Sequence, residues 1–231
     1  MTGRPASGKS EIIDFLVNLP EDDRLQRFHI AKMDIIDDFP MVWTWFEEDD
    51  ILRNELDKQG LHTDEQGYFT HNYLWDLLIH RINLEYQKHL RDDPNYHTHS
   101  TSIIEFSRGS EHGGYQQAFN HLSESVLSSA GIFYVSVSFE ESKRKNRLRF
   151  NPERPDSILE HSLPDEKLTR MYHSDDWTEL CANSSDFLRA GKTNVPYVTF
   201  ENGDDVTSGP PDQLASRLES RLNRLWKLRE I

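Results

Sequence analysis

The chain opens on Gly3-Arg4-Pro5-Ala6-Ser7-Gly8-Lys9-Ser10, a stretch that fits the pattern G-x-x-x-x-G-K-[ST] without a mismatch. The glycines at its two fixed positions let the backbone wrap, so that successive amide N–H groups point at a common centre. Apolar residues at helical spacing follow over Lys9–Leu19, and Pro20 closes that segment. The positive end of this helix adds its field to the loop, and the stretch therefore predicts a cradle for a polyphosphate group.

Two side chains complete the predicted cradle. The ammonium group of Lys9 would reach the β- and γ-phosphates of a nucleoside triphosphate, and the hydroxyl of Ser10 would ligate Mg²⁺. We therefore expect all eight residues from Gly3 to Ser10 to contact the nucleotide. The alternative is a glycine-containing turn before an ordinary helix, without a ligand.

The sequence upstream of the loop is short. A phosphate loop of this kind follows a buried strand, yet only Met1 and Thr2 precede Gly3. Loss of a central strand would leave backbone groups of both neighbouring strands unpaired. We therefore hypothesise that Met1 lies inside the natural chain and that the first strand is largely missing from this sequence. An in-frame stop codon directly before Met1 would contradict this hypothesis.

Composition and charge narrow the choice of partners. Lys and Arg total 26 against 40 Asp and Glu, and the net charge of -14 argues against nucleic acid as a partner. The single cysteine, Cys181, requires no oxidising compartment, which favours the cytoplasm. No apolar run approaches the roughly 20 residues of a membrane helix, so we expect no membrane partner. The oligomeric state stays open.

Short apolar runs alternate with longer helical stretches along the chain. The strand candidates are Phe28–Asp34, Thr101–Phe106, Ile132–Phe139 and Val195–Phe200. The helix candidates after Lys9–Leu19 are Phe69–Leu90, Tyr115–Ala130 and Leu214–Leu228. This alternation predicts an α/β fold with a parallel sheet covered by helices, in one domain over residues 1–231. Two prolines among charged residues mark Asn151–Ser162 as a candidate mobile insertion.

With this loop and this order of elements, nearly the whole chain resembles the P-loop NTPases of the nucleoside and nucleotide kinase-like group, which includes adenylate, shikimate and gluconate kinases. Only the loop is a specific motif, and the rest of the chain resembles this group only in the order of its strands and helices. The resemblance implies a three-layer α/β/α fold with strand order 2-3-1-4-5 and a helical lid. Residues 140–175 would form this lid and an acceptor-side insertion. The resemblance also implies ATP and Mg²⁺ as cofactors.

The resemblance gives roles to residues at the ends of two strands. In the group, the second strand ends at an acidic residue that handles the phosphate acceptor, and Asp34 ends the candidate strand here. Glu105 takes the place of the acid that holds Mg²⁺ or polarises the nucleophile, and Arg108 would bind a substrate phosphate. The residues alone leave open an acidic turn for Asp34, a salt bridge for Glu105 and a structural ion pair for Arg108. An acidic turn explains the following Asp37 and Asp38 better than a catalytic role.

Five basic residues gather between Lys143 and Arg149 in an otherwise acidic chain. Members of the group carry lid arginines here. The three-residue spacing places Arg144 and Arg147 on one helical face, where both would clamp the transferring phosphoryl group. A solvated basic helix face is the alternative. After the last strand candidate, Asn202 lies in a segment that resembles the loop that packs on the adenine base.

The sequence thus predicts a kinase that moves the γ-phosphoryl group of ATP to an unidentified small-molecule acceptor. In this interpretation Glu105 or Asp34 prepares the acceptor, while Lys9, Arg144 and Arg147 stabilise the phosphates in the transition state. The alternatives are a nucleotide-dependent switch or ATPase acting on a protein partner, and a nucleotide-binding relative without catalysis. A kinase yields a phosphorylated small molecule, whereas a switch releases only inorganic phosphate.

Overall fold

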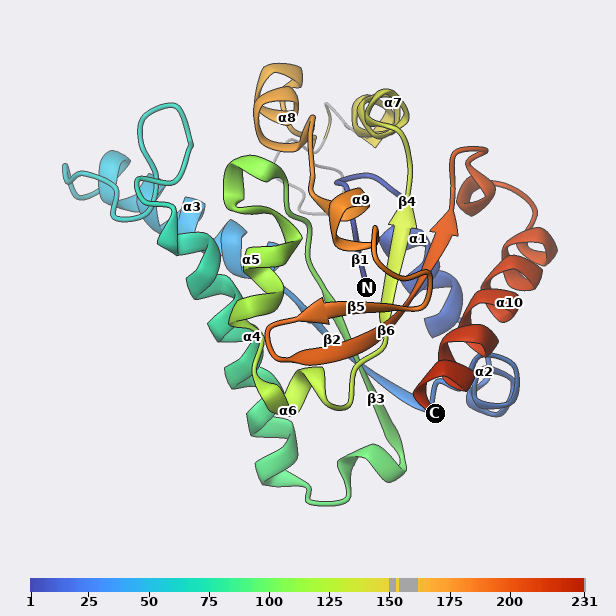
Figure 1. The fold of residues 1–231 in the computed structure, drawn as a ribbon. Coiled ribbons are helices and arrows are strands. Elements are labelled where there is room, and N and C mark those ends of the chain that lie inside the picture. The colour runs from blue at the N-terminus through green and yellow to red at the C-terminus, as the bar shows by residue number, and fades with distance from the viewer. Residues whose placement is uncertain (150–152, 154–161, 231) are drawn as a thin grey trace.

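Strands and helices alternate along the chain and form a mixed α/β structure whose central sheet is mostly parallel (Figure 1). The structure, a computed structural model, describes residues 1–149, 153 and 162–230. The strands are β1 (Thr2–Gly3), β2 (Lys32–Asp37), β3 (Ser100–Glu105), β4 (Ile132–Ser136), β5 (Phe187–Ala190) and β6 (Thr193–Glu201). The helices are α1 (Lys9–Val17), α2 (Glu21–Phe28), α3 (Phe39–Asn54), α4 (Tyr73–Asp92), α5 (Gly114–His121), α6 (Glu124–Leu127), α7 (Phe139–Arg149), α8 (Asp165–Tyr172), α9 (Trp177–Leu180) and α10 (Pro211–Arg229). Short 3₁₀ helices are η1 (Tyr96–Thr98), η2 (Ser110–His112) and η3 (Val206–Ser208).

The strands follow the order β2-β3-β1-β4-β6-β5 across the sheet. Strands β2 and β3 are parallel, and a single parallel bridge from Thr2 to Phe106 joins this pair to β1. Strand β4 runs parallel to β1 and to β6, and β5 adds an antiparallel edge to β6. Because β6 contains the predicted fifth strand, this order agrees with the expected 2-3-1-4-5, and β5 is an addition that the sequence analysis did not predict.

The two residues of β1 hold the centre of the sheet. Thr2 pairs with Tyr134 of β4, and its hydroxyl donates to the carbonyl oxygen of Phe106 at 2.8 Å. The amino group of Met1 donates to the carbonyl oxygen of Ile104 at 2.6 Å. The chain therefore enters the phosphate-loop candidate from between β3 and β4, at the carboxyl ends of these strands.

Helices cover both faces of the sheet, which gives three layers (Figure 1). On one face, α4 and α5 pack over a core that includes Ile82, Tyr115 and Phe119. On the other face, α1, α2 and α10 pack over a second core that includes Leu16, Phe28 and Leu218. Removal of such large apolar side chains from water is the main favourable term in folding. Among the helices of the described ranges, none has both the length and the apolar character of a membrane span.

The predicted second strand, Phe28–Asp34, is wrong in position. Phe28 is instead the last residue of α2 and lies buried in the core. His29 then adopts a left-handed conformation with φ 57°, which ends the helix, and β2 runs from Lys32 to Asp37. The strand therefore ends three residues later than predicted, at Asp37.

Other boundaries also shift. The helix predicted over Tyr115–Ala130 is interrupted at Leu122, and Ser123 caps the next short helix by accepting from the amide of Val126 at 3.4 Å. Phe139 begins α7 rather than ending a strand. The predicted insertion at Asn151–Ser162 lies mostly outside the described residues, as does the middle of the predicted lid over 140–175.

Candidate functional site

The loop between β1 and α1 has a backbone that only glycine fits at two positions. Gly8 has φ 107°, and a Cβ atom there would lie 2.5 Å from Nδ2 of Asn202 and 2.8 Å from Oγ1 of Thr207. A Cβ atom on Gly3 would lie 2.4 Å from the carbonyl oxygen of Val135. Helix α1 then begins at Lys9, so the amide groups of its first turn have no intrahelical partner. The loop is therefore tightly wound and ends at a free helix N-terminus.

Side chains from other elements hold this loop in place. Nδ2 of Asn202 donates to the carbonyl oxygen of Ser7 at 2.7 Å, and Oγ of Ser142 donates to the carbonyl oxygen of Pro5 at 2.7 Å. Arg4 turns to the side, where its guanidinium group lies 2.9 Å from a carboxylate oxygen of Asp175. The loop carbonyls are thus fixed from the β6–α10 connection and from α7.

The ammonium group of Lys9 lies at the centre of this arrangement. Lys9 is 5% exposed, and its Nζ donates to the carbonyl oxygens of Gly3 and Arg4 at 3.3 and 3.0 Å and to Oγ of Ser107 at 2.9 Å. Oε1 of Glu105 lies 3.8 Å from Nζ. Burial lowers the pKa of Lys9, and the Glu105 carboxylate opposes this shift. The structure therefore brings the predicted residues Lys9 and Glu105 together.

Asp37 joins these two residues at the carboxyl end of β2. It is the register partner of Glu105, the last residue of β3, and its Oδ1 accepts from the amide of Phe39 at 2.9 Å. Burial, followed by the charges of Glu105 and Asp38, raises the pKa of Asp37 to about 7. A carboxylate with this pKa exchanges a proton readily at neutral pH. The sequence analysis favoured an acidic turn at Asp37, and the correct end of β2 was the missing signal.

The structure places Asp34 away from this group. Asp34 pairs in register with Ser102, and its Oδ2 accepts from the hydroxyl of Tyr96 at 2.9 Å. Asp37 follows Asp34 by three positions along the strand, a distance of roughly 10 Å. The predicted role of Asp34 beside the acceptor therefore does not fit its position.

Arg108 forms a buried ion pair. Its side chain is 2% exposed, and Nη1 donates to Oδ2 of Asp38 at 2.6 Å. Nη2 donates to the carbonyl oxygen of Trp75 at 3.2 Å, and the guanidinium group lies over the ring of Trp75, 5.1 Å from its centroid. These contacts correspond to the structural ion pair that the sequence left open, and not to a group waiting for a substrate phosphate.

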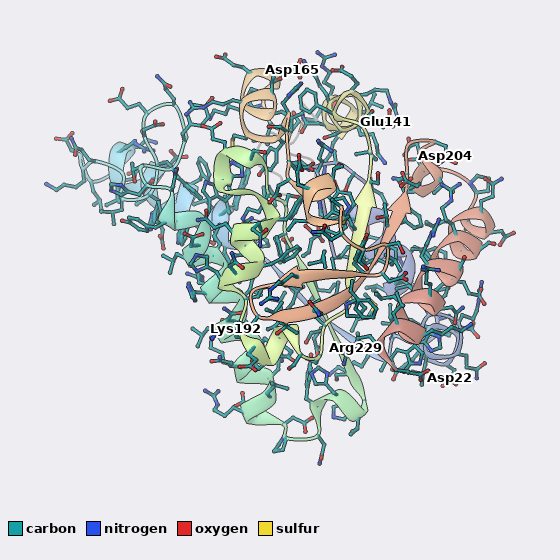
Figure 2. All side chains as sticks on the ribbon, in the orientation of Figure 1. Asp22, Glu141, Asp165, Lys192, Asp204 and Arg229 are labelled. Atoms are coloured by element: carbon teal, nitrogen blue, oxygen red, sulfur yellow. The ribbon has the colours of Figure 1, made fainter. Side chains whose placement is uncertain are left out.

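The basic helix α7 presents its predicted arginines to carboxylates rather than to the loop. Nη2 of Arg144 lies 2.6 Å from Glu141 and 3.0 Å from Asp205, and Arg147 pairs with Asp165 of α8. The side chains of Arg144 and Arg147 are 49% and 63% exposed. Glu141 of α7 and Asp165 of α8 lie at the same end of the molecule (Figure 2). Both arginines are paired with carboxylates of the chain, Arg144 with the connection that follows β6 and Arg147 with the start of α8.

The face of α7 that contacts the loop carries Ser142, and Arg149 lies on this face. Arg149 follows Ser142 by seven residues, nearly two helical turns, whereas Arg144 and Arg147 are rotated from Ser142 by about 160° and 140°. The positive charge of Arg149 also acts on Lys9, where it adds to the larger effect of burial in lowering the pKa. Sequence spacing from Ser142 was a usable signal for Arg149, but the contact of Ser142 with Pro5 was needed to interpret it.

The position of Asn202 does not fit the predicted contact with the adenine base. It has no exposed surface, and besides its bond to Ser7 its Nδ2 donates to Oγ1 of Thr207 at 2.9 Å. A fully enclosed side chain has no face left for a ring to stack on. Asn202 therefore supports the loop through its hydrogen bond to the Ser7 carbonyl oxygen.

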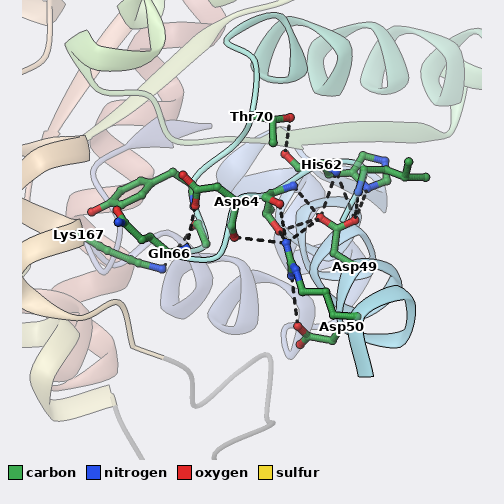
Figure 3. A network of polar contacts seen from close by, with 12 residues as sticks. Asp49, Asp50, His62, Asp64, Gln66, Thr70 and Lys167 are labelled. Carbon is green, nitrogen blue, oxygen red and sulfur yellow. Dashed lines mark hydrogen bonds and ion pairs between the residues drawn. The ribbon is translucent and has the colours of Figure 1, made fainter. Parts of the chain in front are cut away.

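A hairpin-like arm, formed by residues 55–72 between α3 and α4, lies next to α8 (Figure 3). A buried carboxylate of α3 organises this arm. Asp49 has no exposed surface and accepts from the amides of Leu61, His62 and Thr63 at 2.6 to 3.0 Å. Burial alone would raise the pKa of Asp49, but these hydrogen bonds lower it. The arm is therefore an ordered element.

Aromatic and basic side chains connect this arm to α8. The guanidinium carbon of Arg170 lies 4.0 Å from the ring centroid of Tyr68, and Nζ of Lys167 lies 5.2 Å from the same centroid. Arg170 also pairs with Glu111 at 2.8 Å. Trp45, which the sequence marked as an aromatic after the second strand, is buried and stacks on His62 with ring centroids 4.9 Å apart. The arm and α8 therefore meet through exposed charged groups over a packed aromatic base.

The sequence matches none of the known family models, and no curated protein sequence matches it. The geometry of the loop, Lys9 and the two strand-end carboxylates is therefore the basis on which a function can be proposed.

Proposed function

We propose that the chain is a P-loop kinase that transfers the γ-phosphoryl group of ATP to a hydroxyl group of a small molecule. The observation that carries the proposal is the buried ammonium group of Lys9, which follows a glycine loop and lies 3.8 Å from Glu105. The triphosphate would follow the loop and the first turn of α1, where free amides and the helix dipole favour negative charge. The order of the parallel strands supports the same family of folds.

Ser10 and Glu105 are the residues that would hold Mg²⁺. A hydroxyl and a carboxylate are the hard oxygen donors that Mg²⁺ prefers, and this ion usually completes its shell with water and substrate phosphates. Within the described ranges, no three His, Cys, Asp or Glu side chains converge as a ready metal cluster. The donor set therefore suits a metal ion that arrives with the nucleotide. Its charge would offset that on the β- and γ-phosphate oxygens.

Asp37 is the residue that best fits the role of general base in this proposal, in place of Asp34. It stands beside Glu105 at the carboxyl ends of parallel strands, where α/β sheets bind ligands. Its pKa of about 7 leaves a substantial ionised fraction at neutral pH. An acceptor hydroxyl next to Asp37 would be close to the donor phosphates that Lys9 binds.

Arg149 is the arginine of α7 that best fits a contact with the transferring phosphoryl group. It shares a helical face with Ser142, which binds the loop, and its charge acts on Lys9. Arg144 and Arg147, proposed for this role from the sequence, lie on faces of α7 rotated away from Ser142 and pair with Glu141, Asp205 and Asp165. A cation at this position would stabilise negative charge that develops on the equatorial oxygens.

Calorimetry and product analysis test this proposal. Titration of the chain with a non-hydrolysable ATP analogue and Mg²⁺ should show saturable binding that is lost without Mg²⁺. Incubation with ATP and a panel of hydroxyl compounds should then yield a phosphorylated small molecule. No binding of any magnesium nucleoside triphosphate would refute the donor site. Release of inorganic phosphate alone, independent of the panel, would favour the nucleotide-dependent switch.

A further inference from the structure

Three carboxylates meet where the acceptor would bind, on the basis of the proposed function. Asp37 and Glu105 end adjacent strands, and Asp38 follows directly at the start of α3. The charges of Glu105 and Asp38 both act on Asp37. Lys9 lies 3.8 Å from Glu105 and is assigned to the donor phosphates, and Arg108 pairs with Asp38. The cations that pair with these carboxylates are therefore committed before any substrate arrives.

The described arginines at this end of the sheet and in the elements above it are held by carboxylates of the chain itself. Arginine is over-represented where a phosphate or carboxylate group is recognised, because the planar guanidinium group binds these anions in a bidentate manner. The pairs are Arg4 with Asp175, Arg108 with Asp38, Arg144 with Glu141 and Asp205, Arg147 with Asp165, and Arg170 with Glu111. Arg149 is assigned to the transferring phosphoryl group.

Among these ion pairs, the one between Arg108 and Asp38 bears most directly on the charge of the acceptor. Arg108 is the strand-end arginine that would bind an acceptor phosphate, and Asp38 fixes it at 2.6 Å in a site where both side chains are less than a tenth exposed. Separation of a buried ion pair leaves a charge without a partner, which is costly. Lys167 of α8 lies over Tyr68 and is a single flexible ammonium group, a weaker anchor for a planar anion.

We propose that the acceptor is a neutral or cationic hydroxyl compound, such as a nucleoside, a sugar or an amino alcohol, and that it carries no phosphate or carboxylate group. In the transfer, the acceptor oxygen forms a bond to the γ-phosphorus as the bond from this phosphorus to the β,γ-bridging oxygen breaks. ADP leaves with the electron pair of that bond, and the hydroxyl proton passes to the carboxylate of Asp37. Among the described residues, the arginines paired above already contact carboxylates of the chain, so an anionic substituent would have to displace one of these carboxylates.

Matched pairs of acceptors test the proposal on the full chain. The protein is first saturated with Mg²⁺ and the non-hydrolysable ATP analogue, and failure of this step refutes the proposed function rather than the acceptor class. Thermal unfolding is then followed with pairs that differ only in charge: a nucleoside and its 5′-monophosphate, a sugar and its phosphate, an amino alcohol and the related hydroxy acid. Stabilisation by the uncharged or cationic member, with kcat/KM at least tenfold above that of its partner, supports the proposal. A preference for the anionic member overturns it.

Inorganic phosphate gives a test that does not depend on the identity of the acceptor. Wild-type protein loaded with nucleotide should show no saturable stabilisation by phosphate. The Asp38→Asn variant should gain such stabilisation, because Arg108 loses its carboxylate partner. Saturable phosphate binding to loaded wild-type protein would overturn the proposal, and this measurement decides the matter if the variant fails to fold.

Discussion

The phosphate loop and helix α7 both bring positive charge to the carboxyl end of the sheet, but they hold it differently. Lys9 is buried, its ammonium group donates hydrogen bonds to backbone carbonyls of its own loop, and its carboxylate partner Glu105 lies 3.8 Å away. Arg144 and Arg147 are exposed and hydrogen-bonded directly to carboxylates. A cation hydrogen-bonded to neutral carbonyls keeps more of its charge for a ligand than a cation in direct hydrogen-bonded contact with a carboxylate. The number of basic residues in a segment is therefore a poor guide to where an anion binds.

Substitution of the loop cation should have the largest effect. Lys9→Ala is expected to lower the rate of phosphoryl transfer by about 100- to 1,000-fold, the usual loss when a preorganised charged donor is removed. Arg144→Ala is the matched control and should stay within about threefold of wild type. Steady-state kinetics with a saturating acceptor measure both variants, and circular dichroism checks the fold. An equal loss of rate in the two variants would show that the cation of the loop matters no more than an arginine of α7.

Asp37→Asn should separate stability from activity. The pKa of Asp37 is higher in the folded chain than in the unfolded chain, so between about pH 4 and 7 the folded state binds a proton that the unfolded state lacks. Ionisation of Asp37 therefore lowers the free energy of unfolding as the pH rises through this window. The amide removes this cost, and the variant should be more stable than wild type at pH 8, by at most roughly 4 kcal/mol, but not at pH 4.

The same variant should abolish most of the transfer activity. In the wild type, kcat/KM should rise with pH through about 7 as Asp37 loses its proton. Asp34→Asn serves as the control, since Asp34 lies about 10 Å away along β2. Chemical denaturation at the two pH values and a pH–rate profile are the measurements. Full activity in Asp37→Asn together with loss in Asp34→Asn would restore the original assignment of the base.

A substitution at Gly8 tests whether the backbone conformation of the loop is needed for stability and nucleotide binding. Gly8→Ala combines a left-handed φ with a Cβ atom 2.5 Å from Asn202, and it should cost about 1 to 3 kcal/mol of stability and weaken nucleotide binding. Gly203→Ala is the matched control, because nothing lies within 4 Å of its added Cβ atom. Urea denaturation compares the two. A Gly8→Ala variant as stable as Gly203→Ala would mean that the loop is not constrained as described.

The smallest expected effect on activity comes from substitutions that compare the two faces of α7. Arg149→Ala is expected to lower kcat by about tenfold through loss of transition-state charge stabilisation, whereas Arg147→Ala should leave kcat unchanged. The two residues lie on the same helix and carry the same charge, so net charge is controlled. Pre-steady-state kinetics at saturating ATP would show the difference. A larger loss in Arg147→Ala would return the role to the face predicted from the sequence.

The elements predicted best are those whose signal is local. The loop, the start of α1 at Lys9 and the strand that ends beside Glu105 follow from short patterns of glycine, lysine and apolar residues. The parallel sheet follows from the alternation of strands with helices, whereas the order of the strands was implied only by the resemblance to the kinase-like group. A pattern within ten residues is enough for the loop, the helix start and the strand, because each pattern reflects the backbone of the segment that carries it.

The errors arise where a residue is defined by a distant partner. Phe28 ends α2 because its ring enters the core under α10, although its sequence context resembles a strand. Asn202 binds a loop that lies 195 residues away in the sequence. The faces of α7 became distinguishable only through the contact from Ser142 to Pro5, 137 residues apart. Single-sequence periodicity carries no information on such pairs.

The contact between Tyr68 and Arg170 is one of several that join the arm to α8. A cation–π contact at an exposed site is worth about 0.5 to 1 kcal/mol, close to the thermal energy. The buried carboxylate of Asp49 keeps the arm itself intact, and Met171 of α8 packs on the apolar cluster that includes Trp45. Loss of the Arg170 guanidinium group should therefore weaken the junction only slightly, because the apolar packing beneath it remains.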